Sequence, residues 1–466
     1  MKNNICLFLF MLLAGPLTAS GIYNVKDFGA DGKTGRYATR GIQAAIDRCA
    51  GDGGGVVFVP AGEYLCSTLV LKDNVTLYLS GGATLLASNR ESDYTRAFSF
   101  ADTGGGGVPM LIYAEKAKNI AITGCGTIKG QPEYYTEPLG YSSFIAEDCD
   151  AALEAGVPMI ASRWKKPNVS LVFLSECSNV VIRDISLIDS PFWTMHLHWC
   201  DKVRIRSVYM SSRLTVAANS DGIDIDGCRD VVVSDCIIET ADDCICLKTT
   251  KGKDGFRHCE NVTVNNCILR TSSCALKLGT ESYGDFRNVL FSDCIIRDSN
   301  RGLGIFIRDG GTAENVTFSN IEIETVRYPV GWWGSADAFR FVVLKRNDDS
   351  KVGAIRNLCL DNIRAVCQGS NRIAGFDDGQ QIESVMLRNI VLKMAPEPTS
   401  DKRTREALSI TDAKDVTVDG LKIRWTGVPQ PKWSHSIIFD RTNAVKTREI
   451  EIENQPNGLE PIITRN

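Results

Sequence analysis

The chain is poor in histidine and has no run of basic residues. It carries four histidines and a formal net charge of −4 over 466 residues. This charge gives no reason to expect nucleic acid as a partner. Zinc is not expected, because the Cys244-Ile245-Cys246 spacing differs from that of zinc ligands and histidines are few. The sequence therefore predicts no metal site and no cofactor.

Long apolar runs are also missing, apart from one at the N-terminus. Lys2 precedes an apolar run from Ile5 to Leu13, and small residues follow before Gly21. The run is too short to span a bilayer and is typical of an export signal. We predict that residues 1–20 are a cleaved signal peptide and that residues 21–466 form a single catalytic domain. The protein would be periplasmic or secreted, without a membrane partner; an N-terminal anchor is the alternative.

Helical periodicity is scarce, and a short β-rich repeat takes its place. Successive repeats are 23, 28, 31, 27, 27, 42, 27 and 31 residues apart, each with two or three short apolar runs broken by Gly, Asn, Asp or Ser. This pattern predicts an all-β fold, a right-handed parallel β-helix with coils about 4.8 Å apart. A β-propeller would need longer and more even repeats. The repeat is marked by the pairs Asn179-Val180, Lys202-Val203, Asp230-Val231, Asn261-Val262, Asn288-Val289, Asn315-Val316, Asn357-Leu358, Ser384-Val385 and Asp415-Val416.

Two segments depart from the repeat. Thr39 to Cys49 has apolar residues at helical spacing, so we expect a short helix that caps the first coil. Residues 131–168 are rich in Pro, Tyr and Glu and interrupt the coils. Such an excursion from a solenoid usually forms one wall of the binding face.

The seventeen cysteines recur at equivalent positions of the repeat. Free cysteines stacked in a core behave as small hydrophobic residues, and we prefer this interpretation to a disulfide framework. A few disulfides remain an alternative. The equivalent positions are Cys177, Cys200, Cys228 and Cys259 in one set and Cys236, Cys267 and Cys294 in another.

Acidic residues gather in two neighbouring repeats. Residues 219–227 read Asn-Ser-Asp-Gly-Ile-Asp-Ile-Asp-Gly, and residues 241–248 read Ala-Asp-Asp-Cys-Ile-Cys-Leu-Lys. Apolar residues alternate in both, which predicts strands with one buried face and the first acids at the strand starts. Like charges held close together are costly, so this cluster is the candidate functional site.

Aligning the buried residue pairs of five successive coils predicts which functional side chains lie next to one another. We align Met195 and Leu197 with Ile223 and Ile225, Ile245 and Leu247, Leu276 and Leu278, and Ile305 and Ile307. One column then contains Trp193, Asp221, Asp243, Cys274 and Leu303, with Asp242 one residue to the side. Outward columns contain His196, Asp224, Cys246, Lys277 and Phe306, and His198, Asp226, Lys248, Gly279 and Arg308. The face is acidic in the middle, and Lys248, Lys277 and Arg308 are placed to hold carboxylates of an anionic substrate.

Carboxylates on neighbouring coils suit inverting glycoside hydrolysis. One carboxylic acid protonates the leaving oxygen while another carboxylate activates water, at a separation of roughly 6.5 to 9.5 Å. Mutual repulsion raises the pKa of one member, as a general acid requires.

At these residues the sequence resembles glycoside hydrolase family 28, the polygalacturonases and their rhamnogalacturonan-cleaving relatives. Asn219-Ser220-Asp221 is similar to the family's Asn-Thr-Asp signature, and Asp242-Asp243-Cys244 to its Asp-Asp pair. The resemblance implies that Asp242 is the general acid and that Asp221 and Asp243 hold the water. It also implies a pectic, galacturonic-acid-containing substrate. The stretch from Asp27 to Tyr64 is similar to these enzymes as well, but many β-helical proteins share it.

Two motifs differ from the family. Ser273-Cys274-Ala275 replaces Gly-His-Gly, so the customary histidine is absent. Phe306-Ile307-Arg308 replaces Arg-Ile-Lys, which suggests an altered subsite where Phe306 packs on a sugar and Arg308 binds a carboxylate. His196 and His198 are candidates to take over for the missing histidine, although such residues are more often ordinary polar groups beside a groove.

Other interpretations of the acidic cluster stay open. Asp224 and Asp226 are expected to be surface or substrate-contacting carboxylates. A calcium loop is disfavoured, because Val233 occupies the required glutamate position. A β-helical polysaccharide lyase and a non-catalytic glycan-binding protein are the alternative functions. We expect a monomer that acts on pectic polymer or oligosaccharide, in endo or exo mode.

Overall fold

The computed structural model describes residues 21–98, 107–131, 168–214, 219–328, 334–377, 379–398, 400 and 402–465, and the backbone of 136–138 and 162–164. The expected signal peptide lies outside the described residues. Among the described residues, no helix is both long and apolar enough to cross a membrane.

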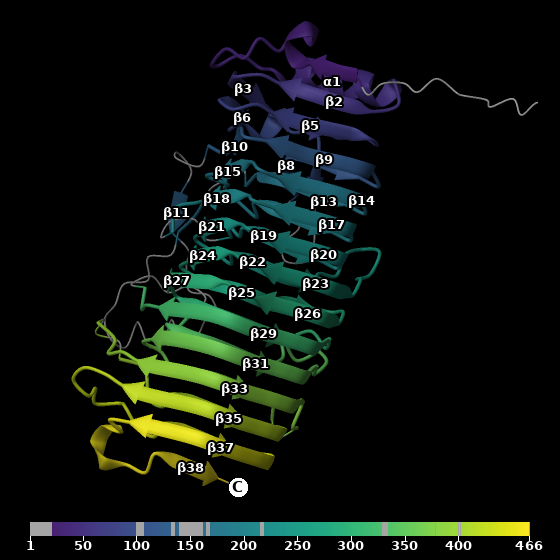
Figure 1. Cartoon of the computed structure of the whole chain (residues 1–466). Helices are drawn as coiled ribbons and strands as arrows, with labels where there is room; N and C mark the ends of the chain where they lie inside the picture. The colour runs from purple at the N-terminus through teal and green to yellow at the C-terminus, as the bar shows by residue number, and fades with distance from the viewer. Residues whose placement is uncertain are drawn as a thin grey trace, which may run out of the picture.

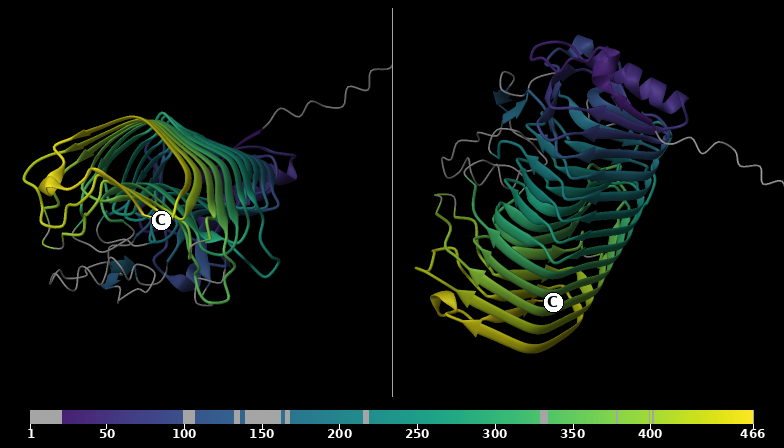
Figure 2. Two further views of the ribbon diagram at one scale, coloured as in Figure 1. Left: turned by 90° about the horizontal axis from the view of Figure 1, so that it is seen from below. Right: turned by 45° about the horizontal axis from the view of Figure 1, so that its top comes forward.

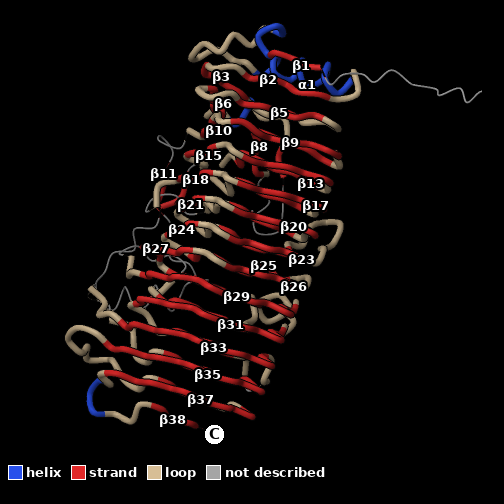
Figure 3. The backbone as a smooth tube through the Cα atoms, in the orientation of Figure 1, coloured by secondary structure: helices blue, strands red, loops and turns tan. Residues whose placement is uncertain are grey.

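Parallel strands stack coil upon coil along one axis, as Figure 1 and the tube in Figure 3 show. The predicted right-handed parallel β-helix is confirmed. Each coil contributes strands to three faces. Two faces join at a corner into a 22-stranded sheet, and the third is a 14-stranded sheet.

The strands of the three faces follow one another in chain order. The first face contains β1 (Gly21–Asn24), β2 (Gly55–Val59), β5 (Val75–Leu79), β9 (Lys118–Gly124), β14 (Ser178–Arg183), β17 (Asp201–Arg206), β20 (Arg229–Ser234), β23 (Cys259–Asn265) and β26 (Phe286–Ser292). The second contains β3 (Gly62–Cys66), β6 (Ala83–Ala87), β10 (Thr127–Lys129), β15 (Ser186–Ile188), β18 (Tyr209–Ser211), β21 (Ile237–Thr240), β24 (Ile268–Thr271) and β27 (Ile295–Ser299). Five long strands then span both faces: β29 (Thr312–Thr325), β31 (Ala354–Cys367), β33 (Ile382–Met394), β35 (Ala413–Trp425) and β37 (Asn443–Glu453).

The third face carries the residues of the candidate site. Its strands are β4 (Leu69–Val70), β8 (Val108–Glu115), β13 (Ser170–Ser175), β16 (Met195–His198), β19 (Ile223–Asp226), β22 (Ile245–Thr249), β25 (Cys274–Ser282), β28 (Arg301–Ile307), β30 (Asp337–Val343), β32 (Asn371–Ala374), β34 (Leu408–Thr411), β36 (Ile437–Asp440) and β38 (Ile462–Arg465). The short strand β7 (Ala97–Phe98) pairs antiparallel with β8.

The predicted capping helix is present as α1 (Thr39–Gly51). Its apolar face is fully buried at Ile42, Ala45, Ile46 and Cys49. Figure 2 shows α1 across the N-terminal end of the coils. Of the excursion at 131–168, the structure describes little beyond the antiparallel strands β11 (Thr136–Pro138) and β12 (Ser162–Trp164). Its role as a wall of the binding face stays a prediction.

The repeated Asn-Val pair marks a corner of the coil. The first residue of every pair has a positive φ, for example 57° at Asn261, 56° at Asn288 and 56° at Asn315. Asparagine and aspartate tolerate this left-handed conformation better than most residues. Their side chains also bond from coil to coil: Asn288 Nδ2 donates to Asn261 Oδ1 at 3.0 Å, and Asn315 Nδ2 donates to Asn288 Oδ1 at 3.0 Å.

The cysteines within the described residues are free, as predicted. Both predicted sets are buried in the hydrophobic core, each 0–1% exposed. Their thiols donate to backbone carbonyls, as Cys200 Sγ does to Leu174 O at 3.3 Å. The stacked cysteines therefore fill the interior of successive coils beside valine and isoleucine.

The corner geometry leads to a stability prediction at Asn288. Asn288→Ala loses the side-chain hydrogen bonds to the neighbouring coils. It also puts alanine at a positive φ, and this backbone conformation alone costs about 1–2 kcal/mol of stability. Asn288→Gly loses the same bonds but adopts this φ freely. Denaturant unfolding should therefore rank wild type above Asn288→Gly and Asn288→Ala last. Equal losses for the two variants would contradict the role of the left-handed corner.

Candidate active site

Three aspartates meet where the second face turns into the third. Asp221 precedes β19 by two residues, and Asp242 and Asp243 lie between β21 and β22. The coils are tied together here, because Gly222 N donates to Asp243 O at 2.8 Å. One carboxylate oxygen from each aspartate lies within 4.8 Å of the other two. The structure thus brings together the three predicted catalytic residues, which we call the aspartate trio.

The three carboxylates converge on one point, because one oxygen of each lies within 4.8 Å of the others. The roughly 6.5 to 9.5 Å of inverting hydrolysis is a separation between whole carboxyl groups, so it is a different quantity from this oxygen-to-oxygen approach. Asp221 and Asp243 occupy the same column of adjacent coils, so the coil spacing of about 4.8 Å brings them together. The expected separation of the carboxyl groups stays a prediction.

Asp243 is the member with a direct ion pair. Lys277 Nζ lies 2.6 Å from Asp243 Oδ2, and both side chains are at most 4% exposed. The other oxygen, Oδ1, accepts from Ser273 Oγ at 2.9 Å and from Cys274 N at 3.3 Å. Burial alone would lower the pKa of Lys277, but the charge of Asp243 raises it above its usual value. The ammonium therefore stays charged beside Asp243.

Asp242 is held by the backbone instead of a cation. Its Oδ2 accepts from Asn219 N and its Oδ1 from Asp243 N, both at 2.9 Å. Burial, and then the nearby charge of Asp243, raise the pKa of Asp242 to about 6. Two adjacent aspartates thus have different environments, which is how one site separates an acid from a base. Asn219 positions Asp242 through its main chain.

Asp221 shares one lysine with two other acids. Lys248 Nζ lies 3.6 Å from Asp221, 3.4 Å from Asp224 and 3.4 Å from Glu281. It also lies 4.2 Å from the centre of the Trp193 ring. Burial, followed by the charges of Asp224 and Asp242, raises the pKa of Asp221 well above its usual value. Lys248 and Lys277 therefore contact acids of the protein itself, where the sequence suggested substrate carboxylates.

The predicted surface role of Asp224 and Asp226 was wrong. Both side chains are 0% exposed. Burial raises the pKa of Asp224 to about 8. Asp226 accepts from His196 Nε2 at 3.1 Å, from Thr250 N at 2.8 Å and from the Thr250 hydroxyl. Burial alone would raise the pKa of Asp226, but the His196 bond, the nearby His198 and the Thr250 hydroxyl together lower it. Outward-facing strand positions are buried here because charged and aromatic side chains from neighbouring coils cover them.

His196 and His198 are both engaged away from the trio. His196 bonds Asp226, and His198 Nδ1 lies 3.0 Å from Ser175 Oγ. Burial lowers the pKa of His198 to about 4. Phe173 meets the His196 ring edge-on at a centroid distance of 4.8 Å and stacks on the His198 ring at 6.3 Å. The two histidines therefore belong to an aromatic cluster on the N-terminal side of the site.

The predicted register of the buried pairs is confirmed from β16 to β25, as far as Leu247 and Leu278, after which the register shifts. Met195, Ile223, Ile245 and Leu276 pair in sequence across these coils. At β28 it was wrong by two residues, because Leu276 pairs with Leu303 and Leu278 with Ile305. Leu303, Ile305 and Ile307 all fit the buried face, and a shift of two leaves an alternating pattern unchanged.

The shift changes the surroundings of Phe306 and Arg308. Gly304, not Phe306, now pairs with Lys277. Phe306 is 4% exposed and packs against Val342 and Ala374. Its ring also lies 5.0 Å from the Arg301 guanidinium carbon and 5.9 Å from Lys277 Nζ. These contacts favour a packing role for Phe306.

Cys274 stays next to the site, and Arg308 follows the end of β28 beside Ser282. Cys274 is 0% exposed and contributes its backbone N–H to Asp243. Arg308 is 8% exposed and donates its backbone N–H to Ser282 Oγ at 2.7 Å. Arg308 stays a predicted substrate contact.

Glu281, Arg346 and Asp309 were missed by the sequence argument. Arg346 Nε lies 2.8 Å from Asp309 Oδ1, and Arg346 lies 3.5 Å from Glu281, which reaches Lys248. The loop that supplies Arg346 has no repeat pattern to place it. Glu281 follows a register shift between β22 and β25, where the alternation ceases to predict which side chains face outward.

The trio could offer oxygen ligands to a metal ion. Among the residues that the structure describes, these three acids have oxygens close enough together to bind one ion. Asp243 and Asp221 already face the ammonium groups of Lys277 and Lys248 at 2.6 Å and 3.6 Å. The two lysine ammonium groups thus already neutralise much of the negative charge that a divalent ion would neutralise. The donor set does not fit a dedicated calcium site, where oxygens without such partners surround the ion.

The model of the glycosyl hydrolases family 28 matches residues 55–402, which include the whole trio. The chain belongs to glycosyl hydrolase family 28. The family resemblance drawn from the Asp motifs is thereby confirmed. Cys274 and Phe306 are departures within a true member of family 28.

Known relatives agree with this assignment. The chain is 24% identical over 274 residues to a probable polygalacturonase of Vitis vinifera, covering 55% of this chain and 51% of that protein. It is 28% identical over 254 residues to an endo-polygalacturonase of Pectobacterium carotovorum subsp. carotovorum, covering 53% and 59%. The chain thus spans about half the length of the curated relatives it matches.

The fold agrees over a longer range. The crystal structure of a hyperthermoactive exopolygalacturonase from Thermotoga maritima superposes with a TM-score of 0.66 at 20% identity. The match covers 93% of this chain and 92% of that one. This likeness supports the β-helix through nearly the whole chain.

The Lys277–Asp243 pair can be tested by stability. Lys277→Met leaves a buried carboxylate without its cation, which costs about 3–5 kcal/mol for a buried pair. The double variant Lys277→Met/Asp243→Asn removes the stranded charge and should recover most of the free energy of unfolding. Lys253→Met, at an exposed lysine, is the matched control. A Lys277→Met loss no larger than that of the control would show that the pair does not stabilise the site.

Proposed function

We propose that the protein is an exported inverting glycoside hydrolase that cleaves α-linked, galacturonic-acid-containing pectic polysaccharide. The observation that carries the proposal is the aspartate trio, in which one oxygen of each residue lies within 4.8 Å of the others. Each member has a different partner: the backbone for Asp242, Lys277 for Asp243 and Lys248 for Asp221.

Asp242 is the general acid in this proposal. A pKa of about 6 leaves a large protonated fraction at mildly acidic pH, so the carboxyl can donate a proton to the leaving oxygen. The two backbone N–H groups hold both oxygens in place and stabilise the carboxylate that forms after transfer. Asp242 thus needs no side-chain partner for its own charge.

Asp243 and Asp221 hold the attacking water. Lys277 and Ser273 orient Asp243, which takes the proton from water as the new bond to the sugar forms. Asp221 lies one coil away in the same column and bonds the water from its other side. Arg308 contacts a carboxylate of the polymer, and the imported negative charge favours protonated Asp242.

A polysaccharide lyase is a weaker account of this site. A lyase on this fold would use lysine or arginine as the base, and an effective lysine base has a lowered pKa. The pKa values of Lys248 and Lys277 are both raised above their usual value by the acids around them. The lysines therefore suit counter-ions better than proton acceptors.

The first test of the function is reducing-end release from polygalacturonan and from a rhamnogalacturonan backbone. Wild type should cleave at least one polymer, and Asp242→Asn should lose about 10²–10⁴-fold of the rate because the acid is removed. Monomer as the sole early product would indicate exo action, and mixed oligomers endo action. Intact polymer after treatment with folded wild type would favour the glycan-binding alternative, and ultraviolet-absorbing unsaturated products would favour the lyase.

The pH dependence offers a second test. The acid must be protonated, so kcat should fall about tenfold per pH unit above about 6, the pKa of Asp242. An aryl galacturonide with a good leaving group needs little protonation, and its basic limb should be shallow. If kcat fell equally steeply, and with the same midpoint pH, on the polymer and on the aryl galacturonide, the titrating group would not be the general acid Asp242.

A further inference from the structure

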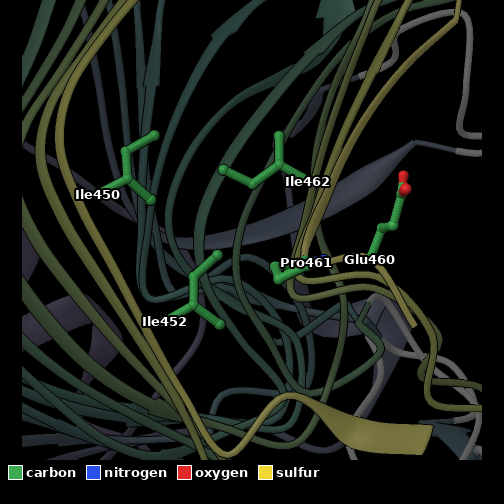
Figure 4. Close-up of a pocket in the computed structure, with 5 residues that line it drawn as sticks. All are labelled: Ile450, Ile452, Glu460, Pro461 and Ile462. Carbon is green, nitrogen blue, oxygen red and sulfur yellow. The ribbon is translucent and has the colours of Figure 1, made fainter. Parts of the chain in front are cut away.

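Within the part of the chain that the structure describes, β37 is the last strand of the 22-stranded sheet and has one unpaired edge. β37 pairs with β35 on one side, and no strand of the described residues pairs with its other side. Ile450 and Ile452 of β37 face Ile462 of β38 across a hollow of about 380 Å³, which Glu460 and Pro461 also line (Figure 4). The N-terminal end, by contrast, is covered by α1. An open strand edge is a ready template for pairing with another strand.

The charges on β37 divide into two arms. The strand turns a corner at Glu449, where φ is 49°. Lys446 and Arg448 lie before the corner, and Glu451 and Glu453 lie after it. The basic arm reads Val-Lys-Thr-Arg over residues 445–448 and the acidic arm Ile-Glu-Ile-Glu over residues 450–453, so every second residue of each arm is charged. One arm is therefore basic and the other acidic.

A second copy of the chain is the partner that this pattern fits. A two-fold axis at the corner would set two β37 strands antiparallel, with the basic arm of each copy along the acidic arm of the other. Lys446 would then lie opposite Glu451 of the second copy, and Val445 opposite Ile452. Arg448 would lie opposite Glu449 in the same register, which gives two kinds of opposite-charge pair, each occurring twice by symmetry. Thr447 opposite Ile450 and Ala444 opposite Glu453 would be the mixed pairs.

Opposite charges already face each other between β37 and the strand of the preceding coil, β35. Lys422 on β35 pairs in register with Glu451 and lies 2.9 Å from it. Arg448 pairs in register with Asp419 in the same way. Lys446 of a second copy would continue the series with a positive charge beyond Glu451.

We propose that the chain forms a tail-to-tail dimer through the outer edge of β37. The hollow lined by Ile450, Ile452 and Ile462 would be closed by the equivalent residues of the second copy. The interface lies far along the coil stack from the aspartate trio, so hydrolysis does not depend on it. This proposal replaces the monomer expected from the sequence and is independent of the proposed function.

Sedimentation equilibrium of the full chain tests the dimer. Wild type should approach twice the chain mass of 51.0 kDa as concentration rises. Lys446→Glu and Glu451→Lys should each weaken dimerisation at least tenfold, because like charges would then face each other. The double variant Lys446→Glu/Glu451→Lys exchanges the two charges and should restore the dimer. Lys118→Glu, an exposed lysine on β9, is the control and should dimerise as wild type does.

Hydrogen exchange supplies a measurement that does not depend on the variants. Amides of β37 should exchange more slowly at concentrations where wild type is dimeric, while those of β20 should not change. A wild type that stays monomeric at every concentration would overturn the proposal. So would a dimer that the single charge reversals leave unchanged, or one that the double variant fails to restore.

Discussion

Hydrogen bonding between parallel strands holds each coil about 4.8 Å from the next, and the site depends on this spacing. Any residue type that recurs in one column is stacked at that distance. For Asn261, Asn288 and Asn315 the stacking produces a ladder of side-chain bonds. For Asp221 and Asp243 it produces repulsion between carboxylates that are almost fully buried. The fold thus supplies close carboxylates without any special loop.

Two lysines make this repulsion tolerable. Lys277 pairs with Asp243, and Lys248 lies among Asp221, Asp224 and Glu281. Both ammonium groups are nearly inaccessible, so solvent screens these pairs little. Negative charge still exceeds positive charge in the site, and this excess, together with burial, raises the pKa values of Asp242 and Asp221. The same electrostatics that permits the fold thereby creates an acid next to a base.

The fold could be predicted from the sequence because its signals are local and repeated. Every Asn-Val pair reports a left-handed corner, and the alternation of Ile223, Ile225, Ile245 and Leu247 gives the register of adjacent coils. The trio followed from the same register. When neighbouring strands have the same alternation of apolar residues, the sequence predicts which residues lie side by side in adjacent coils.

The rest depended on contacts that have no period. The register of β28 was wrong because three successive apolar positions fit equally well. The partners of Lys248 and Lys277 were missed because long side chains reach across coils to acids, as Lys277 does to Asp243 at 2.6 Å. Arg346 comes from a loop, and burial of Asp224 arises from neighbours on other coils.

The stereochemistry of the product tests the central claim most directly. Proton NMR of the first anomer released identifies whether water attacked the sugar directly or displaced an enzyme-bound intermediate. Our account places water between Asp221 and Asp243 and predicts inversion, with the β-anomer appearing first from an α-linked substrate. Early appearance of the α-anomer would show retention, and one of these aspartates would then be a nucleophile rather than a holder of water.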